Sequence, residues 1–294
     1  MSKWIWEPDD FAALWYRDGI DRFPRPLRYL SRYKTRNPYE AHAAAVRARY
    51  DRDEHELIRL ALHTLTDGDL RIEILGASTA TDRGGVREYR VVGAQTTRYG
   101  VVLAQSATDG VDGSVHAQLF AADQLPKRLA GLLPKCGPGR AAPATFHIDD
   151  LASGGEQQQS MRRGPGEQYR RLVRRPADGG GNAGLRVGSI LDRPNPWYGF
   201  RWYDITGDGR YLERRTRQHM SVRPAAPQDF AAGFAEWVDR AVRRLRDDEP
   251  EAWWIYSAAW DGGRAFRWAP QLPVGASARS FGRSLHGGGG NGPR

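Results

Sequence analysis

The stretch that decides the fold runs from residue 70 to 106 and reads LRIEILGASTATDRGGVREYRVVGAQTTRYGVVLAQS. Apolar and polar residues alternate in LRIEIL (70–75), VREYRVVGAQ (86–95) and YGVVLAQS (99–106), and GSVHAQLFA (113–121) continues the pattern. A period of two is typical of strands with one buried face. The connections are too short for crossover helices, so we expect an antiparallel meander.

A second set of alternating runs lies about a hundred residues further on. It consists of GLRVGSIL (184–191), WYGFRWYDI (197–205), GRYLERR (209–215) and HMSVRP (219–224). LRIEILG matches LRVGSIL, GVVLAQ matches GRYLER, and HAQLFAADQL matches HMSVRPAAPQDF, in the same order along the chain. We interpret this as an internal repeat, with two unrelated meanders of similar composition as the alternative.

Helical periodicity separates and follows these runs. It predicts helices at about 9–17, 38–50, 53–65, 122–133 and 228–246. Capping boxes are expected at Asn37 with Glu40 and at Asp53 with Glu56, and the second and third helices read as a hairpin. The expected fold class is α+β: a central antiparallel sheet with flanking helical subdomains and a pseudo-twofold internal repeat.

Composition divides the chain further. We predict one domain over residues 1–246, made of an N-terminal half (1–152) and a C-terminal half (168–246) joined by a polar, Gly-rich connector. Residues 247–274 form a Trp-rich extension, and residues 275–294, rich in Gly, Ser and Arg, read as a disordered tail.

Charge and cysteine content bear on location and partners. The net charge is +9 and the pI is about 9.9, with paired arginines in both halves. Nucleic-acid binding through an Arg-rich surface is therefore an alternative function, although no known nucleic-acid-binding motif accompanies the arginines. The single Cys136 cannot form an internal disulfide, and neither an export signal nor a transmembrane run is recognised, so we expect a cytoplasmic protein.

Motifs of catalysis are missing from the sequence. The seven His residues lack metal-ligand spacing, and no GxSxG elbow, P-loop or dinucleotide-binding glycine motif is present. The triplet Gly207-Asp208-Gly209 lies between two expected strands and reads as a hairpin turn. We therefore predict a protein that is not an enzyme, without catalytic, metal-binding or cofactor-binding residues and without a cofactor.

Several motifs in order resemble the EspG family of type VII (ESX) secretion-associated chaperones. They are EPDDFAALW (7–15), FPRPL (23–27), Thr35, WYDITGDGRYLERR (202–215) and HMSVRPAAPQDFAAGF (219–234), and the resemblance covers about residues 4–240. The polar connector and the Trp-rich extension depart from the family pattern. The fold implied by the resemblance, a central antiparallel sheet with flanking helical subdomains, agrees with the alternating runs.

The resemblance implies an actinobacterial cytoplasmic chaperone whose partner is a secreted helical protein of PE/PPE type or similar. Such a chaperone covers an exposed apolar tip and keeps its client soluble. The implied contact surfaces are the strands 86–95 and 197–205 and the helix 228–245. The side chains chosen by alternation and periodicity are Tyr89, Val91, Phe200, Trp202, Phe230 and Phe234. Packing within the core is the alternative for each one. The client and the oligomeric state are left open.

Overall fold

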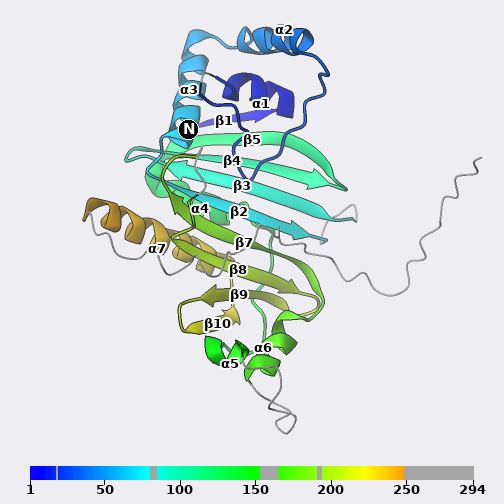
Figure 1. The fold of residues 1–294 in the computed structure, drawn as a ribbon, viewed down its shortest axis with the longest axis vertical. Helices are drawn as coiled ribbons and strands as arrows, with labels where there is room; N and C mark the ends of the chain where they lie inside the picture. Colours follow the sequence, from blue (N-terminus) through cyan, green and yellow to red (C-terminus); the bar gives the residue numbers. More distant parts are fainter. Residues whose placement is uncertain (18, 80–84, 153–164, 191–193, 248–294) are drawn as a thin grey trace, which may run out of the picture.

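A single ten-stranded sheet forms the centre of the protein in the computed structural model, which describes residues 1–17, 19–79, 85–152, 165–190 and 194–247 (Figure 1). All neighbouring strands in it are antiparallel. The strands are β1 (Ser2–Trp6), β2 (Leu70–Ser78), β3 (Arg87–Gln95), β4 (Tyr99–Thr108), β5 (Val111–Ala121), β6 (Ala144–His147), β7 (Ala177–Val187), β8 (Tyr198–Ile205), β9 (Gly209–Arg215) and β10 (His219–Pro224). The predicted α+β class with a large antiparallel sheet is confirmed.

The two edge strands are β1, at the start of the predicted N-terminal half (1–152), and β6, which lies near the end of that half but joins the strands of the C-terminal half. β1 pairs with β5, and β6 pairs with β10. β1 was not expected from the sequence, although its short run alternates: Trp4 and Trp6 are buried, whereas Ile5 is 66% exposed. The run is only five residues long, and the acidic segment that follows hides the pattern.

The strand order is β1-β5-β4-β3-β2-β7-β8-β9-β10-β6. The order follows the same pattern inward from either edge, with β6 in the place of β1 and β7 to β10 in the places of β2 to β5. The halves meet where β2 pairs with β7, with Ile74 opposite Ala183 in the middle of the ladder. The match of LRIEILG to LRVGSIL does not join equivalent positions, because Leu70 begins β2 whereas Leu185 lies near the end of β7. The pseudo-twofold repeat stays a prediction.

A row of side chains crosses the junction between the halves. Tyr89 in β3 lies opposite Gly76 in β2, Gly76 lies opposite Gly181 in β7, and Gly181 lies opposite Trp202 in β8. A Cβ on Gly76 would lie 2.4 Å from the Tyr89 ring, and one on Gly181 would lie 2.5 Å from the Trp202 ring. The two glycines therefore provide the space that the two aromatic rings fill. The Tyr89 hydroxyl donates to the carbonyl of Gly180 at 3.3 Å.

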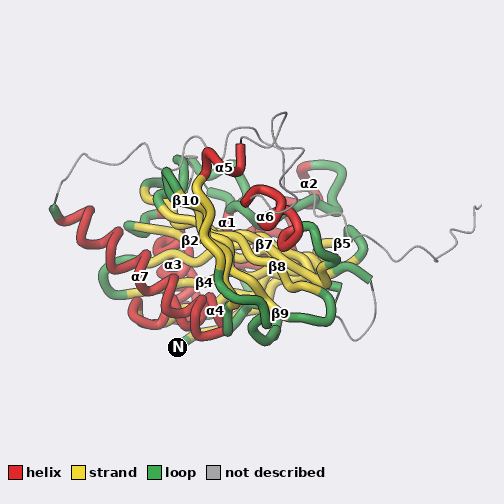
Figure 2. Tube along the Cα trace, turned by 90° about the horizontal axis from the view of Figure 1, so that it is seen from below, coloured by secondary structure: helices red, strands yellow, loops and turns green. Residues whose placement is uncertain are grey.

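Helices cover both faces of the sheet. They are α1 (Pro8–Trp15), α2 (Arg36–Arg47), α3 (Arg52–Thr66), α4 (Leu125–Ala130, preceded by the 3-10 turn Ala122–Gln124), α5 (Ile148–Ala152), α6 (Pro165–Val173) and α7 (Pro227–Arg246). α4 and α7 lie together on one face (Figures 1 and 2). α3 packs against β3 and β4 on the other face. None of the helices described here is long and apolar enough to cross a membrane.

The expected helix starts were shifted. α2 is preceded by Thr35, so that Pro38 is its third residue, and Glu40 pairs with Arg36 rather than closing a box with Asn37. α3 is capped by Asp51, whose side chain accepts from the backbone N–H of Glu54 at 2.8 Å. Both predicted caps, Asn37 and Asp53, were wrong by two positions. α2 packs on α1, whereas α3 packs on the sheet.

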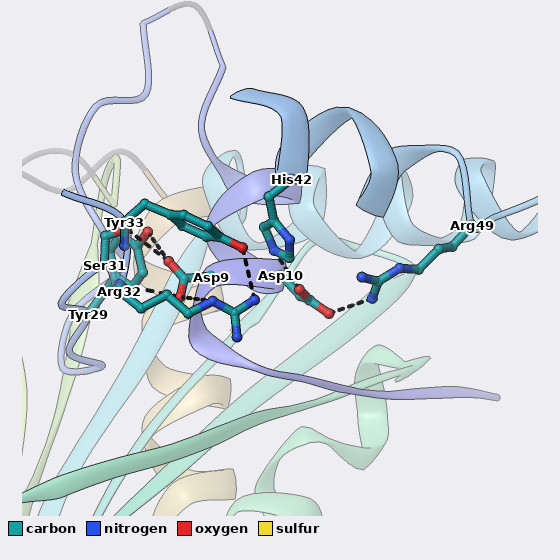
Figure 3. A network of polar contacts seen from close by, with 8 residues as sticks. All are labelled: Asp9, Asp10, Tyr29, Ser31, Arg32, Tyr33, His42 and Arg49. Carbon is teal, nitrogen blue, oxygen red and sulfur yellow. Dashed lines mark hydrogen bonds and ion pairs between the residues drawn. The ribbon is translucent and has the colours of Figure 1, made fainter. Parts of the chain in front are cut away.

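Two adjacent carboxylates of α1 hold the N-terminal region together (Figure 3). Asp9, only 6% exposed, accepts hydrogen bonds from the hydroxyls of Tyr29 at 2.8 Å and Ser31 at 3.0 Å. Asp10 pairs with His42 of α2 at 2.8 Å and with Arg49 at 2.7 Å. The DD of EPDDFAALW thus attaches α2 and the segment 29–32 to α1. This explains the acidic pair next to an apolar helix face.

The predicted extension and tail (247–274 and 275–294) lie outside the described residues apart from Asp247, and so does most of the connector 153–167.

The row of glycines generates the first prediction. Gly76→Ala should lower the free energy of unfolding by about 1–3 kcal/mol, because the new Cβ must displace the Tyr89 ring and the backbone around Gly180. Gly137→Ala is the matched control: nothing lies within 4 Å of a Cβ there, so its effect should stay within about 0.5 kcal/mol. Urea unfolding measures both. Equal effects for the two variants would contradict this account of the row.

Candidate partner-binding groove

A groove of about 1170 Å³ lies between the C-terminal half of α7 and one end of the sheet. Its other walls are the turn 66–69 that leads into β2, the β3–β4 turn 95–97, the segment 122–126 at the start of α4, and the end of β7 at 187–189. This volume is slightly above the range of about 300–1,000 Å³ that is usual for ligand pockets. It suits a peptide segment or several side chains better than a small metabolite.

α7 carries two neighbouring apolar stripes, as helical periodicity requires. The first faces the sheet and is buried: Phe230, Phe234, Trp237 and Ala241. The second follows one step around the helix and lines the groove: Ala235, Val238, Val242 and Leu245. Leu245 is 38% exposed. Val238 is itself buried at 8% exposed, so the accessible apolar floor of the groove consists of Leu245 and the partly exposed Ala235 and Val242.

The six side chains chosen from the sequence lie beneath this site, not in it. All are at most 8% exposed and belong to one core cluster between the sheet and α7; they are Tyr89, Val91, Phe200, Trp202, Phe230 and Phe234. The Phe200 ring lies 4.5 Å from that of Trp237, and Trp202 meets Phe230 edge-on at 5.5 Å. Burial favours the packing alternative. Direct contact of these six with a partner stays a prediction.

Burial also affects the chemistry of two side chains in this region. Burial, with a contribution from the charge of Asp204, raises the pKa of the Tyr89 hydroxyl. Burial likewise raises the pKa of the Cys136 thiol to about 11, so the thiol stays protonated and unreactive at neutral pH. Among the residues that the structure describes, no three His, Cys, Asp or Glu side chains are placed to hold a metal ion.

The start of α7 is fixed by a buried ion pair that the sequence analysis did not single out. Arg210, 1% exposed, pairs with Asp204 at 2.5 and 2.7 Å, and its guanidinium lies over the ring of Phe230 at 5.3 Å. Arg210 also donates to the carbonyl of Pro134 at 2.9 Å. It thus joins β8, β9, the loop before β6 and the first turn of α7. The signal was present in WYDITGDGRYLERR as an Asp and an Arg six residues apart on neighbouring strands.

The cap of α7 adds a second fixed point. Pro227 suits the first helical position, and the Asp229 carboxylate accepts from the backbone N–H of Ala226 at 2.7 Å and pairs with Arg223 at 2.8 Å. Partial burial acts to raise the pKa of Asp229, but the hydrogen bonds from Arg223 and Ala226 outweigh it and hold the pKa below its ordinary value. The lowered pKa favours the charged carboxylate. Its negative charge interacts favourably with the positive end of the α7 helix dipole.

The wall opposite α7 is held from the other face of the sheet. Arg71, 3% exposed, donates to the carbonyls of Gly188 and Ser189, both at 2.8 Å. Glu73 links Arg71 at 3.0 Å to Arg186 at 3.1 Å. The groove thus has a wall that is rigidly supported by an ionic network. This wall is therefore formed in the protein without a bound partner.

The groove is more acidic than the chain as a whole. Four aspartates line it, Asp67, Asp69, Asp123 and Asp239, against the arginines Arg243 and Arg246. Asp67 is paired with His63 at 2.6 Å. Gln95, also in the lining, is 8% exposed, and its Oε1 has no hydrogen-bond partner within the described part of the chain. An unpaired buried acceptor is costly, so a donor from an occupant would be stabilising there.

Many of the paired arginines have partners within the protein. Arg170 and Arg171 pair with Glu167, Arg175 pairs with Asp208, and Arg214 pairs with Glu236. Arg244 lies over the ring of Trp197 at 4.2 Å. These side chains belong to four of the clusters that suggested a nucleic-acid surface. Their contacts give the clusters a structural role that does not involve a phosphate backbone.

Comparison with known proteins gives one match. A model of the EspG family matches residues 7–236, which is more than half of the chain and includes every strand of the sheet except β1, together with the first half of α7. No curated protein matches the chain.

The ion pair beneath α7 generates a prediction. Asp204→Ala should lower the free energy of unfolding by about 3–5 kcal/mol, because it leaves the Arg210 charge buried without a partner. Replacing both residues, Asp204→Ala with Arg210→Met, should recover much of this loss. Glu236→Ala is the control, since it removes exposed pairs worth only about 0–1 kcal/mol. Chemical denaturation at neutral pH tests all three, and a double variant no better than Asp204→Ala would disprove the account.

The cap of α7 generates a pH dependence. Because the folded-state pKa of Asp229 is lowered, its contribution is present above the unfolded-state pKa and is lost as pH falls through the folded-state value. Asp229→Asn should cost about 0.3–1 kcal/mol at pH 7. The difference between wild type and variant should shrink toward zero at acid pH. Unfolding curves of the two proteins across this range measure it, and a constant difference at every pH would refute the electrostatic origin.

Proposed function

The chain belongs to the EspG family, which is associated with a chaperone role in ESX secretion, and on that basis we propose that it is a chaperone that binds a secreted helical protein. It acts in the cytoplasm, by binding and not by catalysis. The observation that carries the proposal is the groove beside α7: an accessible apolar floor on a preformed support. An apolar client tip buried there would be kept from aggregating.

The client fits a helix-in-groove mode. An amphipathic helix presents apolar side chains at i, i+3, i+4 and i+7, and these would meet the stripe of α7 that ends at Leu245. The aspartates around the groove would then contact basic or amide groups at the rim of the client. A PE/PPE-type substrate is the client class that family membership favours.

The proposal also covers the organisation of the chain. Residues 1–246 form one EspG-like domain whose halves, 1–152 and 168–246, are related by a pseudo-twofold repeat with helices as flanking subdomains. The strand order supports the repeat when β6, which pairs with β10, is counted with the C-terminal half. The six core aromatics and aliphatics chosen from the sequence act in client binding by holding α7 at the edge of the groove. Direct contact between them and a client would require α7 to move.

Nucleic-acid binding is the second hypothesis that the sequence raised. The net charge of +9 favours it, whereas the ion pairs and ring contacts of the arginine clusters count against it. A filter-binding titration separates the two functions, because binding to a phosphate backbone falls steeply with rising salt.

The groove generates the test of the proposed function. Leu245→Glu should weaken the complex with the client about tenfold or more, because it places a charge on the apolar floor. Leu57→Glu is the matched control: it is also an exposed helical leucine, 41% against 38%, but lies outside the groove lining. Co-purification of each variant with co-expressed PE/PPE-type pairs gives the measurement. No soluble complex with any pair, even for the wild type, would overturn the proposal.

A further inference from the structure

The described chain ends at the groove itself. Leu245 and Arg246, in the last turn of α7, line it, and residues 248–294 follow directly. We propose that the chain's own segment 253–268, WWIYSAAWDGGRAFRW, docks in the groove. The docking involves only the groove and the segment, so this proposal does not depend on the identity of the protein's client.

The apolar content of the segment argues for an intramolecular site. It holds four tryptophans, Trp253, Trp254, Trp260 and Trp268, together with Ile255, Tyr256 and Phe266. Burying one large aromatic side chain removes about 150–250 Å² from water, so a segment with this composition gains strongly from covering an apolar surface. The stripe Val238, Val242 and Leu245 is the apolar surface nearest to its point of attachment. A volume of about 1170 Å³ has room for several of these rings.

The connection has the right length and chemistry. Residues 247–251 read Asp-Asp-Glu-Pro-Glu, and Pro250 cannot continue the helix, which favours a change of direction just beyond α7. Trp253 lies six positions after Asp247, a reach of up to about 20 Å at about 3.3–3.6 Å per residue. The α7 wall of the groove, from Ala235 to Arg246, is about 16 Å long at about 1.5 Å rise per residue. The segment can therefore return along the whole groove.

Charge gives the segment a preferred placement. Arg264 and Arg267 flank Phe266, so this part of the segment is both apolar and basic. The groove offers the matching surface, an apolar floor with Asp67, Asp69 and Asp123 on the side opposite α7.

Docking of the segment has a consequence for regulation. The docked segment shields the apolar floor in the free protein and must leave before a client enters the same groove. This consequence rests on the function proposed above, whereas the docking does not. Because the segment is tethered, its effective concentration at the groove is on the order of mM, so only a client of matching affinity and concentration displaces it.

Disulfide trapping in the full chain tests the docking. In a Cys136→Ser background, Thr97→Cys places a thiol in the groove lining and Ser257→Cys places one in the middle of the segment. Thr108→Cys replaces Thr97→Cys in the control, since Thr97 and Thr108 are exposed threonines at opposite ends of β4. With oxidised glutathione the Thr97–Ser257 pair should cross-link at least about tenfold faster than the Thr108–Ser257 pair. Equal rates would overturn the proposal.

A second comparison separates docking from mere proximity. Adding Trp253→Ala and Trp254→Ala to the Thr97–Ser257 pair should slow cross-linking about tenfold, because the tether is unchanged while the apolar contacts are lost. Hydrogen exchange of wild type and the Trp variant, both full length, should show faster exchange at 95–97 and 235–246 in the variant. Unchanged cross-linking and exchange would refute docking. If the Leu245→Glu variant still loses its client in that case, the proposed function stands without the docked segment.

Discussion

The structure depends on how two wide aromatic rings are accommodated across the junction of its two meanders. β2 and β7 pair in a register that sets Gly76 opposite Gly181, with Tyr89 and Trp202 on the strands outside them. A one-residue slip of this register would turn the rings to the wrong face of the sheet. Trp202 packs on Phe230, so the same register determines where α7 lies. The groove beside α7 is therefore a consequence of two glycines.

Two buried arginines also fix the position of segments at the edges of the groove. Arg71 and Arg210 are almost fully buried, yet each has a carboxylate partner and also donates to a backbone carbonyl in a loop. A buried ion pair is seldom a large source of stability, but its loss is costly when one partner is left alone. Such pairs specify position. In this protein they place the loop at 188–189 and the start of α7, which are parts of the groove and of its support.

Periodicity in the sequence was sufficient for most of the sheet and insufficient for the site. Seven strands were predicted near their positions because alternation requires only one buried face. The run 184–191 overlaps β7 (Ala177–Val187) only at the end of that strand, because its Gly-rich start shows no alternation, and β1 was missed because five residues carry too weak a signal. Phe230 and Phe234 were predicted on the correct helix, but a stripe on a helix does not say which of two neighbouring faces meets the core. Val242 and Leu245, one step around, proved to line the groove. Its walls come from turns more than a hundred residues apart, and no local pattern predicts that proximity.

The net charge of the chain and the charged residues that line the groove favour different kinds of partner. The chain carries a net +9, and by that measure its partners should be anionic. Yet several of the arginines that the structure describes pair with Glu or Asp or lie over aromatic rings, whereas the groove is lined by four aspartates and two arginines. Exposed charges farther apart than about 8–10 Å are screened at physiological ionic strength, so an occupant of the groove responds to the local set. An apolar segment with basic groups is thus selected there, in spite of the positive charge of the molecule as a whole.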